Sequence, residues 1–326
     1  MAILITGGAG YIGSHMAYAA LERGEDVVVL DNLSTGVRAL VPEKAHFHQG
    51  HVGDRSLLRR LIRGYRVTAV AHFAGSIAVP ESVEKPLVYY ANNTVASRNL
   101  IEACVETGVR YFIFSSTAAV YGMPERNPVM EGAPTAPINP YGRSKLMVEW
   151  MLEDASRAHD FRYVSLRYFN VAGSDPQGRS GQSTPHATHL IKRACQVALG
   201  RIPHLDIFGT NFPTRDGTGV RDYIHVTDLV EAHALALGHL KGGGTSLTLN
   251  CGNGRGYSVK EVIDTVSKVA GHRLPTRHAP PRSGDAAELV ADATKLRREF
   301  AWQPKHDDFE EIVATAYAWE RHLNSA

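Results

Sequence analysis

The chain has 326 residues, of which 44% are hydrophobic and 21% are charged, and its formal net charge is +2. A chain of this length can bury a large core without disulfides or a structural metal. The small net charge argues against a dedicated nucleic-acid-binding protein, whose basic residues would predominate and cluster. No apolar run approaches the roughly 18 residues that cross a bilayer, so we expect neither nucleic acid nor a membrane among its partners.

The amino-terminal segment Ile3–Ile5 is apolar, follows no basic residues and runs directly toward glycines. This pattern is typical of a buried strand rather than of a signal peptide, so we expect a cytoplasmic protein. The three cysteines, Cys104, Cys195 and Cys251, lie inside apolar segments and are expected to be buried and unpaired. The 16 histidines include no H-E-x-x-H arrangement, and we expect no metal site.

Short apolar runs alternate with helical patterns up to about residue 170. Such alternation predicts the α/β class, with a doubly wound parallel sheet of Rossmann type. Ligands bind such sheets at the carboxyl ends of the strands. The predicted strands are Ile3–Ile5, Val27–Leu30, Thr68–Phe73, Tyr111–Ser115 and Tyr163–Tyr168, and the predicted helices include Ile12–Arg23, Val88–Glu106 and Leu146–Ala158.

The pattern becomes irregular beyond about residue 175, where Pro- and Gly-rich stretches separate helices such as His189–Gly200 and Val259–Ala270. We therefore expect residues 1–175 to form the Rossmann domain and residues 176–326 to form mainly a smaller, mixed α/β substrate-binding lobe. Two later segments, near 222–230 and 246–252, also have strand character and could return to the main sheet.

A glycine-rich segment, TGGAGYIG at residues 6–13, follows the first predicted strand and opens the first predicted helix. Gly7 permits a tight bend, Gly10 lets a pyrophosphate approach the backbone, and Gly13 lets the helix pack closely against the strand. Asp31 ends the second strand at about the spacing where a carboxylate accepts ribose hydroxyls. The same charge would repel the 2′-phosphate of NADP, so the expected cofactor is NAD.

A helix is predicted to begin at Asn139 and Pro140, which suit the N-cap and the first helical position. Tyr141 and Lys145 then share one helix face. A tyrosine needs roughly 4 kcal/mol of phenolate stabilisation to act as a base near pH 7. An ammonium about 5 Å away supplies roughly 3 kcal/mol at an effective dielectric constant near 20. The positive ring of NAD⁺ could supply the rest, which would couple proton transfer to hydride transfer.

Hydroxyl side chains follow the strand 111–114 in the run SSTAAVYG at residues 115–122. They would lie at the carboxyl end of a strand, upstream of Tyr141. One of these hydroxyls can bridge a substrate oxygen and the tyrosine. The hydroxyl run therefore strengthens the interpretation of Tyr141 and Lys145 as a catalytic pair.

Eight motifs occur in the order in which UDP-glucose 4-epimerases of the extended short-chain dehydrogenase/reductase family carry them: TGGAGYIG, LDNLSTG, HFAG, FSSTAAVYG, NPYGRSK, RYFNVAG, DGTGVRDYIHVTD and PRSGD. The chain is similar to this family over nearly its whole length. The resemblance implies reversible inversion at C4 of UDP-glucose and UDP-galactose through a transient 4-keto sugar, as in galactose metabolism, with tightly bound NAD as a recycling oxidant.

The resemblance also implies roles for individual residues. Thr117, Tyr141 and Lys145 correspond to the catalytic trio. The NAD contacts correspond to Gly7, Gly10, Tyr11, Ile12, Gly13, Asp31, Asn32, Phe73, Ala74, Gly75, Asn93, Ser115, Tyr141, Lys145 and Tyr168. The UDP-sugar contacts correspond to Thr117, Asn170, His189, Leu190, Phe208, Arg221, Tyr223, Arg282, Asp285 and Leu289. The two arginines suit a pyrophosphate, and the aspartate suits a ribose hydroxyl.

Four positions depart from the pattern of the resembling family. His51 stands where many members have an aspartate that contacts adenine, and Ile77 replaces a lysine near the cofactor phosphates. Cofactor retention could therefore be weaker. His189 replaces an asparagine and could still donate to phosphate or ribose. Leu289 replaces a tyrosine, and the smaller side chain could admit an N-acetyl group.

Other functions remain open at this point. A 4-epimerase of UDP-GlcNAc, UDP-xylose or UDP-glucuronate fits the same motifs. A dehydratase or decarboxylase fits less well, because Ala118 and Ala119 follow Thr117 where an acid would be needed. A non-catalytic NAD-sensing protein would be expected to lack part of the trio. A homodimer through helices 88–106 and 146–158 matches the resembling family, although packing within one chain explains their apolar faces equally well.

Overall fold

The computed structural model describes residues 2–184, 187–282 and 285–325. A seven-stranded sheet of order β10-β6-β5-β4-β1-β2-β3 forms its centre, and every neighbouring pair in this sheet is parallel. The predicted doubly wound Rossmann-type sheet is confirmed. Its strands are β1 (Ala2–Thr6), β2 (Asp26–Asp31), β3 (His46–Gln49), β4 (Val67–His72), β5 (Tyr111–Ser115), β6 (Arg162–Tyr168) and β10 (Leu247–Cys251).

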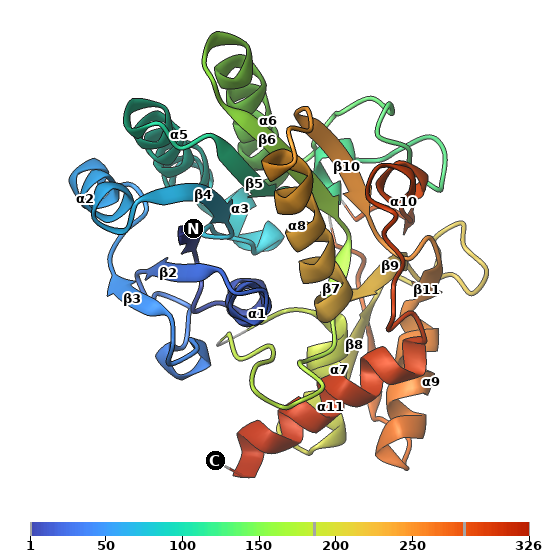
Figure 1. Cartoon of the computed structure of the whole chain (residues 1–326). Coiled ribbons are helices and arrows are strands. Elements are labelled where there is room, and N and C mark those ends of the chain that lie inside the picture. The colour runs from blue at the N-terminus through green and yellow to red at the C-terminus, as the bar shows by residue number, and fades with distance from the viewer. Residues whose placement is uncertain (1, 185–186, 283–284, 326) are drawn as a thin grey trace.

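Helices cover both faces of this sheet (Figure 1). Ile3 and Ile5 of β1 pack toward α1 (Tyr11–Glu22) and α8 (Val226–Lys241). Leu4 points to the opposite face, where the covering helices are α2 (Arg55–Tyr65), α5 (Ala96–Thr107) and α6 (Pro140–Ala158). Successive side chains of a strand point to opposite faces, so burial on both faces explains why the predicted strands are apolar without alternation.

The rest of the chain builds two smaller sheets and a third core. β9 (Val220–His225) pairs with β7 (Asn170–Ala172), β11 (Gly256–Ser258) and β13 (Glu288–Leu289), and β8 (Leu205–Phe208) pairs with β12 (Thr276–Ala279). The helices α7 (Leu190–Ala198), α9 (Val259–Ala270) and α11 (Phe309–Ser325) pack against one another around this core, while α10 (Thr294–Phe300) packs on α8 and β10.

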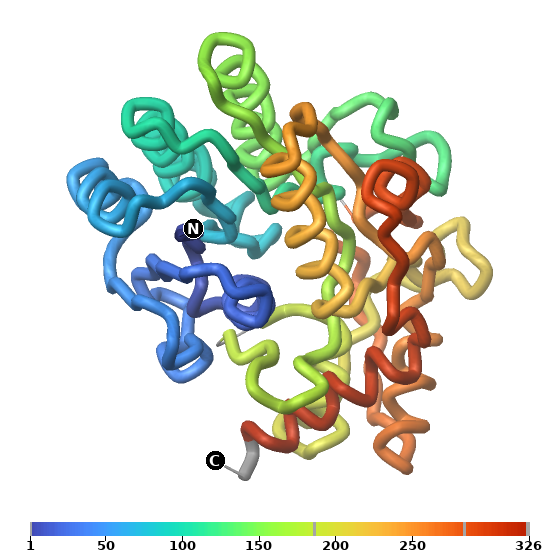
Figure 2. Tube along the Cα trace, in the orientation of Figure 1, coloured from blue at the N-terminus to red at the C-terminus, as the bar shows by residue number. Residues whose placement is uncertain are grey.

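Of the two later segments considered for the main sheet, one joins it and the other does not. β10 lies in the main sheet beside β6. The expected strand near 222–230 does not join it: β9 belongs to a smaller sheet, and the residues after it begin α8, which packs on β5 and β6. Figure 2 shows this return of the chain, with the gold and orange trace of α8 and β10 against the green trace of β5 and β6.

The helix predicted over residues 88–106 is interrupted. It consists of α4 (Pro86–Tyr89), a π-helical turn over Tyr90–Val95, and α5. A short helix, α3 (Val79–Glu84), precedes it. Single π turns inside helices recur at functional sites, and this one carries Asn93.

Because the strands of the main sheet are parallel, their carboxyl ends meet at one edge. The segments that follow β1, β2, β4, β5 and β6 all emerge there, and they contain most of the residues predicted to bind the cofactor and to act in catalysis. Among the described helices, none is both long and apolar enough to cross a membrane.

The β1–α1 turn generates a stability prediction. A Cβ at Gly13 would lie 2.2 Å from the Gly7 carbonyl oxygen, whereas a Cβ at Gly238 in α8 meets no atom within 4 Å. Gly13→Ala should therefore lower the free energy of unfolding by about 1–3 kcal/mol. Gly238→Ala, the matched control, should raise it by about 0.5–1 kcal/mol. Denaturant unfolding measures both changes, and equal stability of the two variants would contradict the close packing of this turn.

Candidate active site

The glycine turn at residues 7–13 packs directly on the segment after β4. Gly7 has a φ of 72°, and a Cβ there would lie 2.6 Å from the Ala74 amide nitrogen. Gly10 differs, because a Cβ on it would meet only the Gly7 carbonyl oxygen, at 3.2 Å. The amino terminus of α1, where Tyr11 and Ile12 begin the helix, therefore has an open approach at Gly10 that suits a pyrophosphate.

Asp31 is buried at the end of β2 and connects two turns. One carboxylate oxygen accepts the Ala9 amide at 3.0 Å, and the other accepts the Leu33 amide at 2.8 Å. An ionised carboxylate has about four acceptor positions, so both oxygens can also accept ribose hydroxyls. The exposed Asn32 follows, and its side chain accepts the Ser34 amide. The open glycine turn and this carboxylate fit NAD.

Two positions that depart from the pattern of the resembling family lie in the segments after β3 and β4. His51 is exposed, and its Nδ1 accepts the Gly53 amide at 3.0 Å. Ile77 is 48% exposed. Ile77 carries no charge in place of the lysine, so the backbone groups of the glycine turn remain the main candidates for neutralising phosphate.

Asn93 connects the segment after β4 with α6. Its Oδ1 accepts the Ser76 amide at 2.7 Å, and its Nδ2 donates to the Ser76 carbonyl at 2.9 Å and to the Ser144 hydroxyl at 3.0 Å. A Cβ on Gly75 would lie 3.0 Å from the Asn93 Oδ1 and 3.7 Å from the Lys145 ammonium. The predicted cofactor residues Gly75 and Asn93 therefore lie near Lys145, and Ala74 directly precedes Gly75.

The predicted trio comes together where α6 begins. The Asn139 side chain caps the helix by accepting the Gly142 amide at 2.9 Å, as predicted from its residue type. A Cβ on Gly142 would lie 2.6 Å from the Ala119 carbonyl oxygen, so the start of α6 lies directly against the segment that follows Thr117. Tyr141 hydrogen-bonds with Thr117, and the side chains of both residues are buried.

Lys145 is also buried, and its ammonium donates to the Ser115 carbonyl at 2.9 Å and lies 5.0 Å from the centre of the Phe114 ring. Burial lowers the pKa of Lys145 to about 8, and the negative charge of Glu149 opposes that effect. Lys145 therefore has two local partners for its cationic form, a carbonyl and an aromatic ring.

The surroundings of Tyr141 favour its protonated form. Burial raises the pKa of this phenol above its ordinary value, and the hydrogen bond with Thr117 lowers it. The protein side chains alone do not bring the pKa of this phenol near 7, because the effect of desolvation outweighs that of the neighbouring groups. With its pKa raised in this way, the Tyr141 phenol keeps its proton near pH 7.

Three more predicted cofactor residues gather around a histidine that the sequence analysis missed. His233 of α8 lies with its ring 4.9 Å from Phe73 and 6.3 Å from Tyr168, and its Nε2 is 3.4 Å from the Ser115 hydroxyl. Burial lowers its pKa to about 4, so the ring is neutral. A polar residue on the otherwise apolar, sheet-facing side of α8 is the signal that could have identified it.

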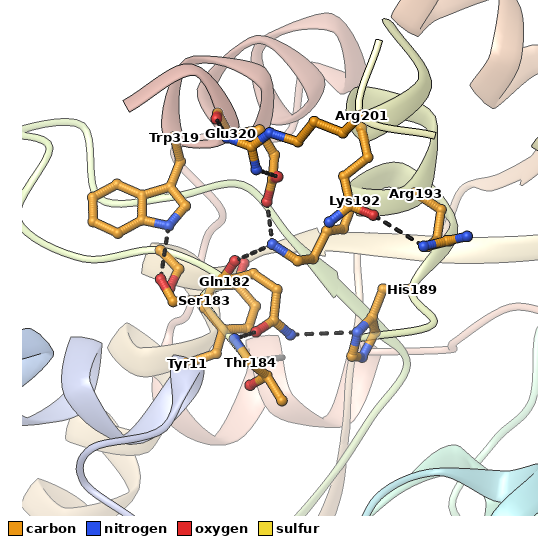
Figure 3. Close-up of polar contacts among 12 residues, drawn as sticks. Tyr11, Gln182, Ser183, Thr184, His189, Lys192, Arg193, Arg201, Trp319 and Glu320 are labelled. Carbon is orange, nitrogen blue, oxygen red and sulfur yellow. Dashed lines mark hydrogen bonds and ion pairs between the residues drawn. The ribbon is translucent and has the colours of Figure 1, made fainter. Parts of the chain in front are cut away.

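Part of the predicted substrate site lines a small cavity shared with Tyr11. Asn170, His189, Leu190 and Tyr223 contribute to its wall. Figure 3 shows His189 beside Gln182, whose side-chain nitrogen lies 3.3 Å from the histidine Nδ1. The buried Lys192 points from α7 toward the Gln182 carbonyl and pairs with Glu320 of α11, which fixes the amino-terminal turn of α7 against α11 (Figure 3).

The remaining substrate candidates form two pairs. Arg221 lies 3.8 Å from Asp285, and the guanidinium of Arg282 lies 3.7 Å from the centre of the Phe208 ring. Leu289 pairs with Arg221 across β13 and β9 and packs on the cluster that includes Ala118. The Ser283–Gly284 part of the PRSGD motif lies outside the described residues. Within the described ranges, no group of three or more His, Cys, Asp or Glu could hold a metal ion.

Comparisons with known proteins agree with this geometry. A curated relative from Azospirillum brasilense, named UDP-glucose 4-epimerase, is 56% identical over 99% of this chain and 93% of its own length. The crystal structure of UDP-glucose 4-epimerase from Brucella ovis in complex with NAD is 42% identical over 97% of both chains, with a TM-score of 0.94. The structure of the UDP-Glc/GlcNAc 4-epimerase from Campylobacter jejuni is 47% identical over 98% of this chain and 99% of that chain, with a TM-score of 0.86.

The family model described as the NAD dependent epimerase/dehydratase family matches residues 3–252. These residues include the glycine turn, Asp31 and the trio. This match covers most of the chain, and together with the close relatives it establishes the family. The chain belongs to the NAD dependent epimerase/dehydratase family.

Proposed function

We propose that this chain catalyses the reversible C4 epimerisation of UDP-glucose and UDP-galactose. The observation that carries the proposal is the buried contact of Tyr141 with Thr117 beside the Lys145 ammonium, at the sheet edge where the glycine turn and Asp31 suit NAD. Relatives named UDP-glucose 4-epimerase, one of them in complex with NAD, support the same reaction. Ala118 and Ala119 follow Thr117 in place of the acid that a dehydratase would need.

The side chains of this chain divide the work of the reaction. Tyr141 takes the proton of the C4 hydroxyl and later returns it, while Thr117 holds the sugar oxygen and the phenol in line. The Lys145 ammonium stabilises the phenolate. The glycine turn and Asp31 would hold NAD, which would supply a hydride acceptor that recycles, so the net redox change would be zero. Asn93, Phe73 and Tyr168 hold the cofactor side of the site in place.

The nucleotide is assigned to Asn170, His189, Leu190, Phe208, Arg221, Tyr223, Arg282 and Asp285. Their polar and charged groups suit uridine diphosphate, whereas few of these candidates are left for the hexose. A firmly held nucleotide and a loosely held sugar let the 4-keto intermediate present its other face. Leu289 beside Arg221 leaves more room than a tyrosine would, which favours UDP-GlcNAc as a second substrate, as in the UDP-Glc/GlcNAc 4-epimerase relative.

The organisation of the molecule belongs to the same proposal. Residues 1–175, with α8 and β10, serve as the NAD-binding domain, and the remainder of 176–326 serves as the UDP-sugar-binding lobe. We assign the enzyme to the cytoplasm as part of the same proposal. Exposed apolar side chains on α4, the π turn and α6 support a homodimer: Leu87, Val88, Val95 and Trp150 are each at least 54% exposed.

Product identification tests the proposal. The purified protein is incubated with UDP-galactose, UDP-N-acetylgalactosamine and UDP-xylose, without added reductant. We expect UDP-glucose from UDP-galactose, and UDP-GlcNAc from the second substrate. Accumulation of a 4-keto-6-deoxy sugar in place of an epimer would contradict the proposal.

Tyr141→Phe should abolish turnover while leaving the binding of UDP largely intact, because the phenol moves the proton and the ring keeps its packing. We expect a loss of kcat of at least about 10²-fold. Steady-state kinetics and calorimetric titration with UDP measure the two effects. Tyr65→Phe, which removes a hydroxyl that contacts His48, is the matched control and should retain the parent rate. Undiminished turnover of Tyr141→Phe would remove this residue from its role.

The dimer has its own test. Replacing Leu87 and Trp150 together by aspartate places charges in the exposed apolar surface and should convert dimers to monomers, because buried unpaired charges oppose association. Light scattering coupled to size exclusion gives the molar mass. Met130→Asp, which changes another exposed apolar side chain, should leave the dimer unchanged. A monomeric parent protein would refute the dimer.

A further inference from the structure

Glu149 is a buried carboxylate that the reaction as described does not use. It lies on α6, four residues after Lys145 and eight after Tyr141, and is 5% exposed. The Ser116 hydroxyl donates to its Oε1. Arg167 donates from Nε to the same oxygen at 3.0 Å and from Nη2 to Oε2 at 2.5 Å. Three donor groups from two other segments therefore converge on one side chain of the catalytic helix.

Arg167 extends the hydrogen-bond network beyond Glu149. The Nη1 of Arg167 donates to the Tyr121 hydroxyl at 3.0 Å, and the guanidinium lies 5.0 Å from the centre of that ring. The Tyr121 hydroxyl donates in turn to the Asn250 Oδ1 at 2.7 Å. Glu149 thus connects α6 with the end of β5, the turn at 118–121, β6 and β10.

The partners of Glu149 are sequence neighbours of the site residues. Ser116 directly precedes Thr117, and Arg167 directly precedes Tyr168. We propose that Glu149 is a positioning residue for epimerisation: by binding Ser116 and Arg167 it holds Thr117, Tyr168 and the Tyr141–Lys145 pair in one fixed arrangement. This inference rests on the proposed function.

The charge of Glu149 has a second effect. The charged or titratable groups that act on Lys145 are Glu149 from α6 and His72 from β4, and burial lowers the pKa of His72 to about 3, so this ring is uncharged. The titratable groups that interact with Tyr141 are Tyr89 and Tyr168, and Thr117 hydrogen-bonds with it. The groups that face Glu149 are Arg167, Tyr121 and Tyr163 in addition to Lys145. Glu149 favours the protonated form of Lys145.

Removing this negative charge makes both Lys145 and Tyr141 easier to deprotonate. In the complex with NAD, the positive nicotinamide ring would lower the pKa of Tyr141, and we then expect the acid limb of the rate profile to follow Tyr141 and the alkaline limb to follow Lys145. Glu149→Gln should therefore move both limbs to lower pH, by about one pH unit. A buried ion pair with only a structural role would change stability and leave the profile in place.

The kinetic experiment compares the parent protein with Glu149→Gln, using UDP-galactose as substrate. We expect kcat to fall at least about tenfold, because a misaligned Thr117 and Tyr141 react slowly, while KM changes less than about threefold. The control is Glu25→Gln. Glu25 directly precedes β2, at the amino end of the sheet, and the change breaks its ion pair with Lys241. It should keep the parent kcat and the parent pH profile.

Two further measurements keep the test decisive. The double variant Glu149→Gln with Arg167→Gln leaves no unpaired guanidinium in the core, so it should recover the melting temperature while its kcat stays low. Titration of the Tyr141 phenolate absorbance, isolated by subtracting the matching Tyr141→Phe proteins, should show ionisation at lower pH in Glu149→Gln.

The outcomes separate the two proposals. An inactive parent protein would refute the epimerase, while the phenolate titration would still test Glu149. An active parent whose Glu149→Gln variant keeps its kcat, its pH profile and its phenolate titration would overturn the positioning role alone.

Discussion

A buried ammonium beside a buried phenol is the constraint on which the site depends. Burial disfavours the charged form of Lys145, and it also disfavours the phenolate that Tyr141 would form in the proposed reaction. The Ser115 carbonyl, the Phe114 ring and Glu149 offset the first penalty. The second is offset by the hydrogen bond with Thr117, which forms only when the phenol is held in place. Positioning and electrostatics are therefore inseparable here.

The parallel sheet makes that arrangement possible. Its strands end at one edge, so residues distant in sequence converge without long loops. Gly7 approaches the backbone of Ala74, and Asn93 bonds across to Ser144, which fixes the cofactor side of the site relative to α6. Of the predicted nucleotide-binding residues, Tyr223 belongs to the third core, formed by α7, α9 and α11, and Leu190 packs against it.

Local patterns predicted the parts of the molecule that local physics determines. The cap at Asn139, the four-residue spacing of Tyr141 and Lys145, and the two-faced burial of β1 all follow from short-range rules. The pKa of Tyr141 could not be predicted in this way, because burial by tertiary neighbours raises it and outweighs the hydrogen bond with Thr117. His233 and Glu149 were missed for the same reason: their partners come from other segments.

Strand pairing shows the same limit. β9 has the composition of a main-sheet strand, yet it pairs with β7, β11 and β13, because its partners are decided by the packing of the second half of the chain. The π turn at Asn93 is also invisible to periodicity, since its residues fit an ordinary helix. The substrate candidates rest on the resemblance, because no spacing rule connects Arg221 with Asp285 or Phe208 with Arg282.

The central claim is that Tyr141, Lys145 and Thr117 serve an oxidation that reverses within the same site. UDP-galactose carrying deuterium at C4 tests it most directly. We expect UDP-glucose that retains the deuterium at C4, with no net formation of reduced cofactor. Loss of the label to solvent, or a stable ketone product, would contradict the claim.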